Sequence, residues 1–347
     1  MKGAGMIRNL CMALIAIGLT GGIASAQFVA NVSKVATTAA PFLTIGVGAR
    51  AVGMGGAFVA TASDASALYW NPGGLARLER PETLIMHTQW LADMSFNYAG
   101  LVVPIGRFGA LGMSVTTLTM PDMLVRTVEQ PDGTGERFSA NDLALQLSYG
   151  ISLTDRFSIG FNAKYVHQQI WKERASGFAI DIGTLFTTGL KGMRIGATLS
   201  NFGTDMKLAG EDLLVFYDVD PKKAGNNDRV FADLKTDRWP LPLSFQVGVA
   251  LEAFENENNR LTLALDAVNP TDNTESLNLG MEYAFRELFF LRAGYRDLFL
   301  RDGEQGLTVG AGMVARFLGN VALQLDYAYA DFGRLENVQR FAVRILF

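Results

Sequence analysis

Two histidines, His87 and His167, are the residues best suited to acid–base chemistry in this chain. A hydrolase would need a nucleophile and an orienting polar group beside one of them, and no recognisable nucleophile motif accompanies either. The acidic residues do not cluster at the spacings that zinc ligands require. We therefore expect no catalytic residue and no metal site, and we expect both histidines in a lumen or at an interface.

One stretch of chain has the composition to hold calcium. The segment between Asp205 and Asp237 is dense in aspartate, whose carboxylates are calcium ligands. Bound calcium is the alternative for this segment, and a solvated charged loop is the interpretation that we prefer.

Glycines at positions 46 and 48, with Ala51, match the spacing of a dinucleotide-binding fingerprint, and Asp64 follows where a ribose-binding acid could stand. The context argues against this function, because no strand–helix–strand pattern surrounds the motif. Three further glycines would interrupt the helix that the fingerprint needs: Gly53, Gly55 and Gly56. We expect no nucleotide and no other cofactor.

Residues 1–26 have the composition of a secretory signal that is cleaved from the mature protein. Lys2 and Arg8 supply its positive start, an apolar stretch follows, and Ala24-Ser25-Ala26 fits a cleavage site. The only cysteine, Cys11, lies in this leader, so the mature chain would have no thiol for a disulfide or a thiolate metal site. Loss of the leader makes the net charge of −4 still more negative, which argues against nucleic acid as a partner.

The last residues of the chain alternate between apolar and polar side chains. Arg340, Ala342 and Arg344 point one way, and the opposite face carries Phe341, Val343, Ile345 and Phe347. A strand that crosses a bilayer needs about 9–11 residues with this alternation. A terminal aromatic after such a segment is typical of the strand that closes a bacterial outer-membrane barrel.

The same alternation recurs from about residue 84 onward and predicts about fourteen strands. Beyond the leader, no apolar run reaches the roughly 18 residues that a membrane helix needs. Since unpaired backbone groups are costly in lipid, a spanning chain without such helices must be a closed barrel. We therefore predict an all-β membrane protein whose antiparallel barrel spans residues 83–347, and we weigh it against a soluble β-sandwich, which usually has fewer strands.

Charged residues interleave with the apolar ones, and we expect them to face the lumen because a cation facing lipid costs roughly 2–4 kcal/mol. These lumen charges are Asp142, Lys164, Asp181, Arg194, Glu252, Asp266, Glu282, Arg292, Arg296, Arg316, Asp326 and Arg344. Both signs occur, so we expect ion pairs inside the wall. Three long connections, at 121–138, 204–239 and 298–305, are expected outside the cell, and the tight turns between the other strands in the periplasm.

Residues 27–82 do not have the pattern of spanning strands, and we predict that they form a hatch, or plug, in the lumen. Two runs in this segment, 48–60 (GARAVGMGGAFVA) and 64–76 (DASALYWNPGGLA), resemble the hatch of FadL-type outer-membrane proteins, and are most similar to the PorV/PorQ branch. Asn71-Pro72-Gly73 stands where that superfamily carries Asn-Pro-Ala. The resemblance covers essentially the whole mature chain, since a hatch followed by a fourteen-strand barrel is the family architecture.

The resemblance assigns candidate residues to the hatch. Those expected to shape or gate it are Asp64, Trp70, Asn71, Pro72 and Gly73, and the glycines expected to allow its tight turns are Gly48, Gly53, Gly55 and Gly56. For Asp64 and Asn71 we prefer a backbone-capping role to a direct role in gating. For Trp70 we expect packing against the barrel wall.

Two functions follow from the resemblance. PorV-like members serve type IX secretion, binding a secreted cargo protein and parts of the secretion machine through extracellular loops. FadL-like members instead pass hydrophobic small molecules such as fatty acids across the outer membrane. Because the many inward charges leave little room for a broad apolar path, we favour the secretion adaptor, a non-enzymatic protein of the bacterial outer membrane in contact with its lipid.

Overall fold

The computed structural model describes residues 34–190, 192–223, 229–300, 303–317 and 321–347, and Lys34–Phe347 form one compact unit. The predicted leader, the first seven residues of the predicted hatch and the predicted turn at Leu318-Gly319 lie outside the described residues. Among the described residues, no helix has the length and apolarity needed to cross a membrane.

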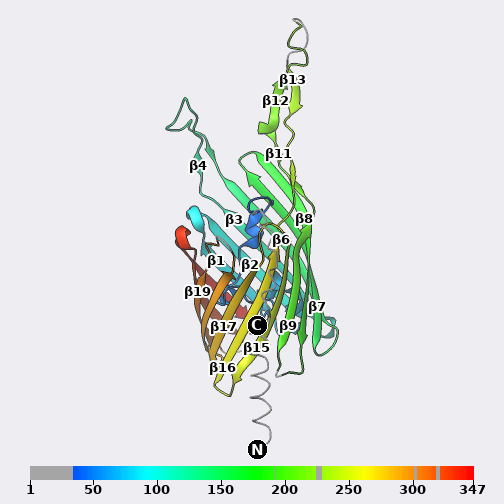
Figure 1. Cartoon of the computed structure of the whole chain (residues 1–347), viewed down its shortest axis with the longest axis vertical. Coiled ribbons are helices and arrows are strands. Elements are labelled where there is room, and N and C mark those ends of the chain that lie inside the picture. The colour runs from blue at the N-terminus through cyan, green and yellow to red at the C-terminus, as the bar shows by residue number, and fades with distance from the viewer. Residues whose placement is uncertain (1–33, 191, 224–228, 301–302, 318–320) are drawn as a thin grey trace, which may run out of the picture. The chain divides into compact units, whose positions relative to one another are not determined.

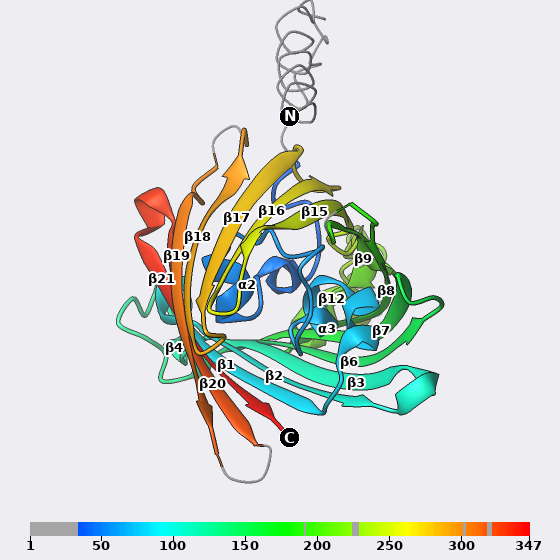
Figure 2. The same cartoon turned by 90° about the horizontal axis from the view of Figure 1, so that it is seen from below.

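Fourteen long antiparallel strands form a closed ring (Figures 1 and 2). They are β1 (Glu82–Gln89), β2 (Ser95–Pro104), β3 (Ala110–Thr119), β6 (Ala140–Ser152), β7 (Phe157–Ile170), β8 (Glu173–Thr187), β9 (Arg194–Gly203), β15 (Ser244–Glu255), β16 (Asn259–Pro270), β17 (Ser276–Phe285), β18 (Phe289–Leu298), β19 (Leu307–Arg316), β20 (Ala322–Asp331) and β21 (Asn337–Leu346). The first strand pairs with the last, since Glu82 is opposite Leu346. The ring is complete because β8 also pairs with β9. The prediction of a closed barrel of about fourteen strands is confirmed.

Side chains alternate between the two faces of each strand, as β21 illustrates. Arg340 points into the ring with 1% of its surface exposed, whereas its neighbour Phe341 points outward and is 57% exposed. The outward positions of the other strands are also mostly large and apolar: Ile85, Leu111, Met113, Leu147, Phe161, Phe178, Leu265, Leu279, Leu291 and Leu325. The β-sandwich alternative is wrong, because a sandwich would bury this apolar set between its two sheets.

The connections differ at the two ends of the ring. Short turns lie at one end, among them the 3₁₀ turn η4 (Gly106–Phe108) and the three-residue turn 286–288. The other end has the 3₁₀ turns η3 (Leu91–Asp93) and η6 (Gly333–Leu335) and the longer connections that the sequence predicted. One of these carries the hairpin β4 (Met123–Leu124) and β5 (Arg137–Phe138).

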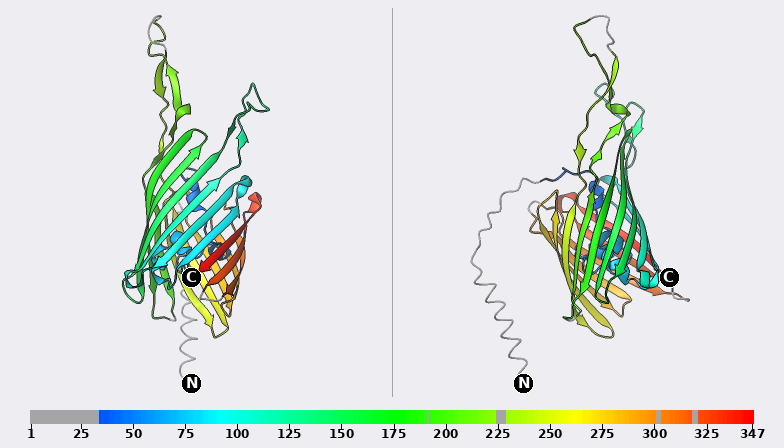
Figure 3. Two further views of the ribbon diagram at one scale, coloured as in Figure 1. Left: turned by 180° about the vertical axis from the view of Figure 1, so that it is seen from behind. Right: turned by 90° about the vertical axis from the view of Figure 1, so that its right-hand side faces the viewer.

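The longest connection, between β9 and β15, has more structure than the solvated loop that we preferred. It contains β10 (Met206–Lys207), β11 (Ala209–Gly210), the 3₁₀ turn η5 (Glu211–Leu213), β12 (Leu214–Tyr217), β13 (Val230–Asp233) and β14 (Arg238–Trp239). Two of these strands, β12 and β13, form a hairpin of their own that extends beyond the ends of the barrel strands (Figure 3). Both strands, Leu214–Tyr217 and Val230–Asp233, are short runs that contain valine and aromatic residues, which favour the strand conformation and account for the hairpin.

The segment from Lys34 to Leu78 enters the barrel through the exposed residues 34–37, and most of it lies inside the ring of strands, as the view along the barrel shows (Figure 2). It consists of short elements: η1 (Pro41–Thr44), α2 (Ala49–Gly53), α3 (Ala67–Trp70) and η2 (Pro72–Arg77). We call it the lumen segment. Its first α-helix contacts β18, β19, β20 and β21, and η2 contacts β2, β3, β6, β7 and β8.

Glycines in the wall allow this close contact. A Cβ atom at Gly160 of β7 would lie 2.1 Å from the carbonyl oxygen of Pro72, and one at Gly294 of β18 would lie 2.2 Å from the amide nitrogen of Gly55. Both distances are far below van der Waals contact. Backbone of the lumen segment therefore rests directly on backbone of the wall at these two points.

Candidate functional site

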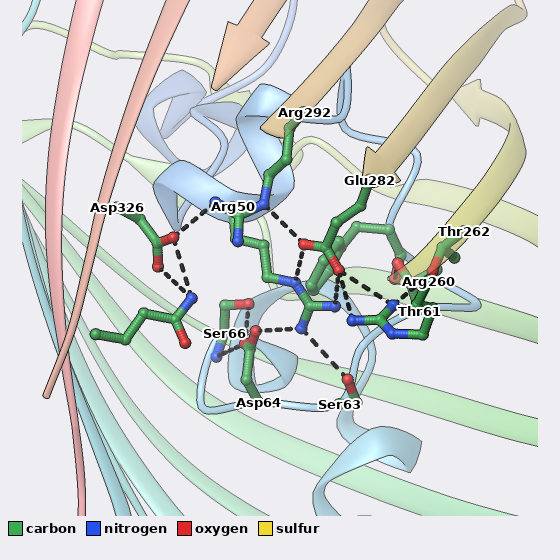
Figure 4. Close-up of polar contacts among 12 residues, drawn as sticks. Arg50, Thr61, Ser63, Asp64, Ser66, Arg260, Thr262, Glu282, Arg292 and Asp326 are labelled. Carbon is green, nitrogen blue, oxygen red and sulfur yellow. Dashed lines mark hydrogen bonds and ion pairs between the residues drawn. The ribbon is translucent and has the colours of Figure 1, made fainter. Parts of the chain in front are cut away.

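An ion pair joins the lumen segment to the wall. Arg50, in α2, places its Nε 2.8 Å from Oε2 of Glu282 on β17, and its Nη1 2.9 Å from Oδ2 of Asp64 (Figure 4). Glu282 and Asp64 are both buried. Arg50 thus connects a carboxylate of the wall with a carboxylate of its own segment.

Further charges extend this cluster around the inner wall. Arg292 on β18 donates to Glu282 over 2.7 Å and to Asp326 on β20 over 2.6 Å. On the opposite side of Asp64, Arg344 of β21 lies 3.4 Å from both Asp64 and Glu82. Because each buried charge has a partner of opposite sign, the cluster can remain ionised away from bulk water.

Asp64 and Arg50 are the two members of this cluster in the lumen segment, and their pKa values favour the charged forms that the ion pairs require. Burial alone would raise the pKa of Asp64, but the guanidinium groups of Arg344 and Arg50 and a hydrogen bond from Ser66 outweigh it and lower the pKa to about 2. Burial alone would lower the pKa of Arg50, but the carboxylates of Glu282 and Asp64 outweigh it and raise the pKa. Both groups are therefore charged throughout the physiological range.

Asn71 binds the middle of the lumen segment to the barrel wall through hydrogen bonds of its side chain. Its side-chain amide donates to the carbonyl oxygens of Val59, 2.8 Å away, and of Thr184 on β8, 2.9 Å away. Its Oδ1 accepts the N–H of Gly73 over 3.0 Å, and Pro72 follows Asn71 as the first residue of η2. Asn71 caps this turn and also binds the wall, in line with the preferred capping role. Asp64 shapes its own turn by accepting the N–H of Ser66 over 2.9 Å.

The lumen charges predicted from the sequence lie on the inward face of their strands. Asp266 of β16 accepts two backbone N–H groups of the lumen segment, those of Phe58 and Val59, over 2.8 and 2.9 Å. Lys164 pairs with Asp181 at 2.7 Å, and Arg194 with Glu252 at 2.5 Å. Three members remain. Asp142 accepts a hydrogen bond from Gln168 over 3.1 Å, Arg296 is half-buried, and Arg316, at the end of β19, is exposed.

The four predicted glycines occupy tight points of the lumen segment. Gly48, Gly55 and Gly56 have positive φ angles of 83°, 66° and 75°. A side chain at Gly55 would also place its Cβ 2.6 Å from the carbonyl oxygen of Leu279. Gly53 ends α2 and lies against Gly310 of β19. The helix α2 begins inside the Gly46–Ala51 motif and has five residues.

Trp70 lies where the lumen segment faces the end of the barrel with the long loops. The indole Nε1 donates to the carbonyl oxygen of Val47 over 2.7 Å, and the rings of Tyr69 and Phe58 pack edge-on against it. A cavity of about 190 Å³ lies beyond, lined by Leu43, Tyr69 and Trp70 on its inner side and by mostly polar residues of the wall. These ring partners belong to its own segment, and the packing of Trp70 against the wall stays a prediction.

The hairpin of β12 and β13 carries exposed aromatic residues. Phe216 and Phe231 are 64% and 70% exposed, and their ring centroids lie 4.9 Å apart. Other apolar side chains of this connection are exposed as well: Leu214, Tyr217, Val219, Val230, Leu234 and Trp239. Contiguous apolar patches of this kind on a protein surface mark sites of contact with another molecule.

The two histidines lie on the outer face of the barrel, so a place in the lumen is wrong and one at an interface remains. His87 of β1 shares a hydrogen bond of 2.7 Å with Asn97, and His167 of β7 shares one of 2.9 Å with Ser176. Among the described residues, no group of three or more His, Cys, Asp or Glu side chains has the arrangement of a metal site.

A family model described as "Type IX secretion system protein PorV" matches residues 28–213, more than half of the chain. The chain belongs to the PorV family. As a PorV-family protein it is an outer-membrane barrel of the type IX secretion system, as the sequence predicted. A search of curated proteins finds no sequence match.

Solved structures with the same fold are outer-membrane channels. The monoaromatic hydrocarbon channel CymD has 14% identity and a TM-score of 0.55, with 87% of this chain and 97% of CymD covered. The Pseudomonas putida toluene transporter TodX has 12% identity and a TM-score of 0.53, and the Ralstonia pickettii toluene transporter TbuX has 13% and 0.52, each with 87% of this chain and 97% of the other covered. Because the identities are this low, these similarities show only that this chain shares the fold of these channels.

Three charged residues that contact the cluster were not among the predicted site residues. Arg50 is part of the resembling motif, yet we gave it no role; the signal was that it is the only charge between Gly46 and Ala60. Glu82 and Arg260 lie near strand ends, where alternation is hardest to follow. Glu82 accepts the N–H of Ala65 over 3.0 Å, and Arg260 lies 3.4 Å from Glu282.

Proposed function

We propose that this protein is a non-enzymatic adaptor of type IX secretion that binds a secreted cargo protein, or another component of the machine, through its extracellular loops. The observation that carries the proposal is the exposed aromatic pair Phe216 and Phe231 on a hairpin above a filled lumen. An adaptor needs an accessible contact surface and does not need an open passage.

The hairpin offers two kinds of contact to a protein partner. Its aromatic pair can pack against an apolar surface, and aromatic side chains contribute strongly to protein interfaces. The strands β12 and β13 form a two-stranded sheet, so each also has an outer edge to which a strand of cargo can add. Charged residues flank the pair, among them Asp218, Lys222 and Asp233, and supply the polar rim of an interface.

The lumen supports the adaptor over the alternative, a conduit for hydrophobic small molecules such as fatty acids. A conduit needs an apolar path beside the lumen segment. In this chain such a path would meet the ion pair of Arg50 with Glu282 and the buried amide of Asn71, which bind the lumen segment to the wall. It would also meet the ion pair of Glu282 with Arg292, which joins two neighbouring strands of the wall. An apolar molecule that passed here would have to separate these pairs, and a buried charge left without its partner is costly.

The test replaces both aromatic residues, Phe216→Ser with Phe231→Ser, in the full chain. We expect the barrel to assemble normally, because both side chains are exposed, and we expect the secreted proteins that copurify with the barrel to fall at least tenfold. Val128→Ser is the matched control, since Val128 is a fully exposed apolar residue in a different long loop. The proposal fails if the double variant retains cargo as the control does. Uptake of a labelled fatty acid that depends on the barrel and is equal in all variants would support the conduit instead.

A further inference from the structure

A pocket of about 580 Å³ lies on the outer face of the barrel, at the seam where β1 meets β21. Its wall consists of outward side chains of these two strands, His87 and Gln89 from β1 and Asn337 and Gln339 from β21. The turns η3 and η6 contribute its upper rim, including Asp93 and Glu336. This pocket is separate from the lumen and from the β12–β13 hairpin.

The pocket lies toward the end of the barrel with the long connections, above exposed apolar residues of the outer face. Directly below its polar wall, the next outward residues toward the short-turn end are Ile85 on β1 and Phe341 on β21, both exposed and apolar. Beside it, Gln339 pairs with Tyr329 and Phe341 with Tyr327 on β20. Tyrosines concentrate at the headgroup level of membranes, so a ligand in this pocket would be the headgroup part of an outer-leaflet lipid.

The chemistry of the lining selects the kind of headgroup. The described residues that line the pocket include no lysine or arginine, and its two charged members, Asp93 and Glu336, are acidic. A phosphate or carboxylate would be repelled by them and would find no cation. Amide groups of Gln89, Asn337 and Gln339 both donate and accept hydrogen bonds, and carboxylates accept them, which suits the hydroxyl groups of a sugar.

One exposed aromatic side chain suits a sugar. Phe341 is 57% exposed at the base of the pocket, and its ring centroid lies 5.2 Å from that of Tyr327. An aromatic surface of this kind can pack against the apolar C–H face of a pyranose ring. Trp90 also borders the pocket, but its ring contacts the buried Phe332 and Arg340 on the inner side of the wall, so we assign it no contact with the sugar.

The backbone of the rim is also unusual. Ala92, Asp93 and Glu336 line the pocket and have positive φ angles of 55°, 58° and 69°. Residues other than glycine adopt this left-handed conformation at a cost of about 1–3 kcal/mol, and such residues cluster at binding sites. Both turns carry this strain at the point where they border the pocket.

We propose that the pocket binds a saccharide, the glycan headgroup of an outer-leaflet glycolipid, at the β1–β21 seam. His87 contributes an acceptor: its Nδ1 is engaged with Oδ1 of Asn97, so the neutral imidazole presents Nε2 to the pocket. Gln339 and Asn337 supply amide donors, and Asp93 and Glu336 accept hydroxyl protons. This site does not depend on the proposed adaptor function, since it shares no residue with the hairpin.

The test compares His87→Ala with Gln339→Ala, made together, against the matched control His167→Ala. His167 is also an outer-face histidine bonded to a polar neighbour, but it lies on β7 away from the pocket. The full chain is placed in phospholipid nanodiscs that contain an uncharged glycolipid, monogalactosyl diacylglycerol, and bound glycolipid is measured by native mass spectrometry after release. Binding of the free headgroup sugar, as methyl galactoside, is measured by calorimetry.

We expect the double variant to bind both probes at least about tenfold more weakly than the wild type, as the loss of two hydrogen-bonding groups implies, and the control to bind them normally. Binding of the glycolipid without any binding of the methyl galactoside would overturn the proposal, because the lipid part alone would then be recognised. Equal binding by the double variant and the control would overturn it as well. Gln89→Leu is a second variant on the same wall and should give the same loss if the double variant is recovered poorly.

Discussion

The guanidinium of Arg50 lies 2.8 Å from the carboxylate of Glu282, although 232 positions of sequence separate the two residues. Arg50 belongs to the lumen segment and Glu282 to strand β17. This contact is the point where the charge network of the wall continues into the segment that fills the barrel. The stability of the filled state therefore depends on a small number of buried charges.

Replacing Glu282 by glutamine should strongly destabilise the barrel, because Arg50 and Arg292 would both lose their shared buried carboxylate. Breaking a buried pair typically costs about 3–5 kcal/mol. The free energy of unfolding can be measured by urea titration in lipid vesicles. Asp212→Asn is the control, because its pair with Lys172 is exposed and should be worth less than about 1 kcal/mol. Equal losses in the two variants would contradict the proposed importance of the cluster.

Acid should weaken the hold of the lumen segment through Asp64. Its pKa is about 2 in the folded protein against an ordinary value of 3.8. A lowered carboxyl pKa gives stability that is fully present above the unfolded value and is lost as the pH falls through the folded value. The difference in unfolding free energy between the wild type and Asp64→Asn should thus be constant above about pH 5 and shrink between about pH 4 and pH 2. A difference that does not change with pH would show that Asp64 is not held by its arginine partners.

Gly73→Ala should also be destabilising, although alanine is the residue usual in the related motif. A Cβ at Gly73 would lie 2.9 Å from the carbonyl oxygen of Gly183 and from Cα of Thr184, both in the backbone of β8. Backbone cannot move aside cheaply, so we expect a loss of about 1–3 kcal/mol. Gly189→Ala is a suitable control, because the nearest atom to its Cβ would be 3.6 Å away at the tip of the Arg156 side chain. Unfolding midpoints that agree for the two variants would count against this close contact.

The barrel was predictable because its alternation is a local property of each strand. Outward Phe341 and inward Arg340 follow from period two and from the cost of a charge in lipid. The partners of the inward charges were not predictable in this way. Arg50 meets Glu282 only because the lumen segment folds back into the ring, and nothing in the sequence near either residue carries that information.

The hairpin was missed for a different reason. Its two strands are short and stand among many charged residues, so composition indicated a solvated loop, while the pairing of Phe216 with Phe231 depends on a turn between distant positions. The outer pocket combines residues from both ends of the barrel sequence. His87 and Phe341 are neighbours only because the ring closes between its first and last strands.

The central claim is that the extracellular hairpin binds protein while the lumen segment stays in place. The most direct measurement is a cryo-EM structure of the protein extracted in mild detergent together with the partners that copurify. The account predicts density for a soluble protein against Phe216 and Phe231, with Arg50 still paired to Glu282 in a filled lumen. Lipid-like density in a tunnel beside Asn71 and Pro72, with the lumen segment displaced from the wall, would contradict it.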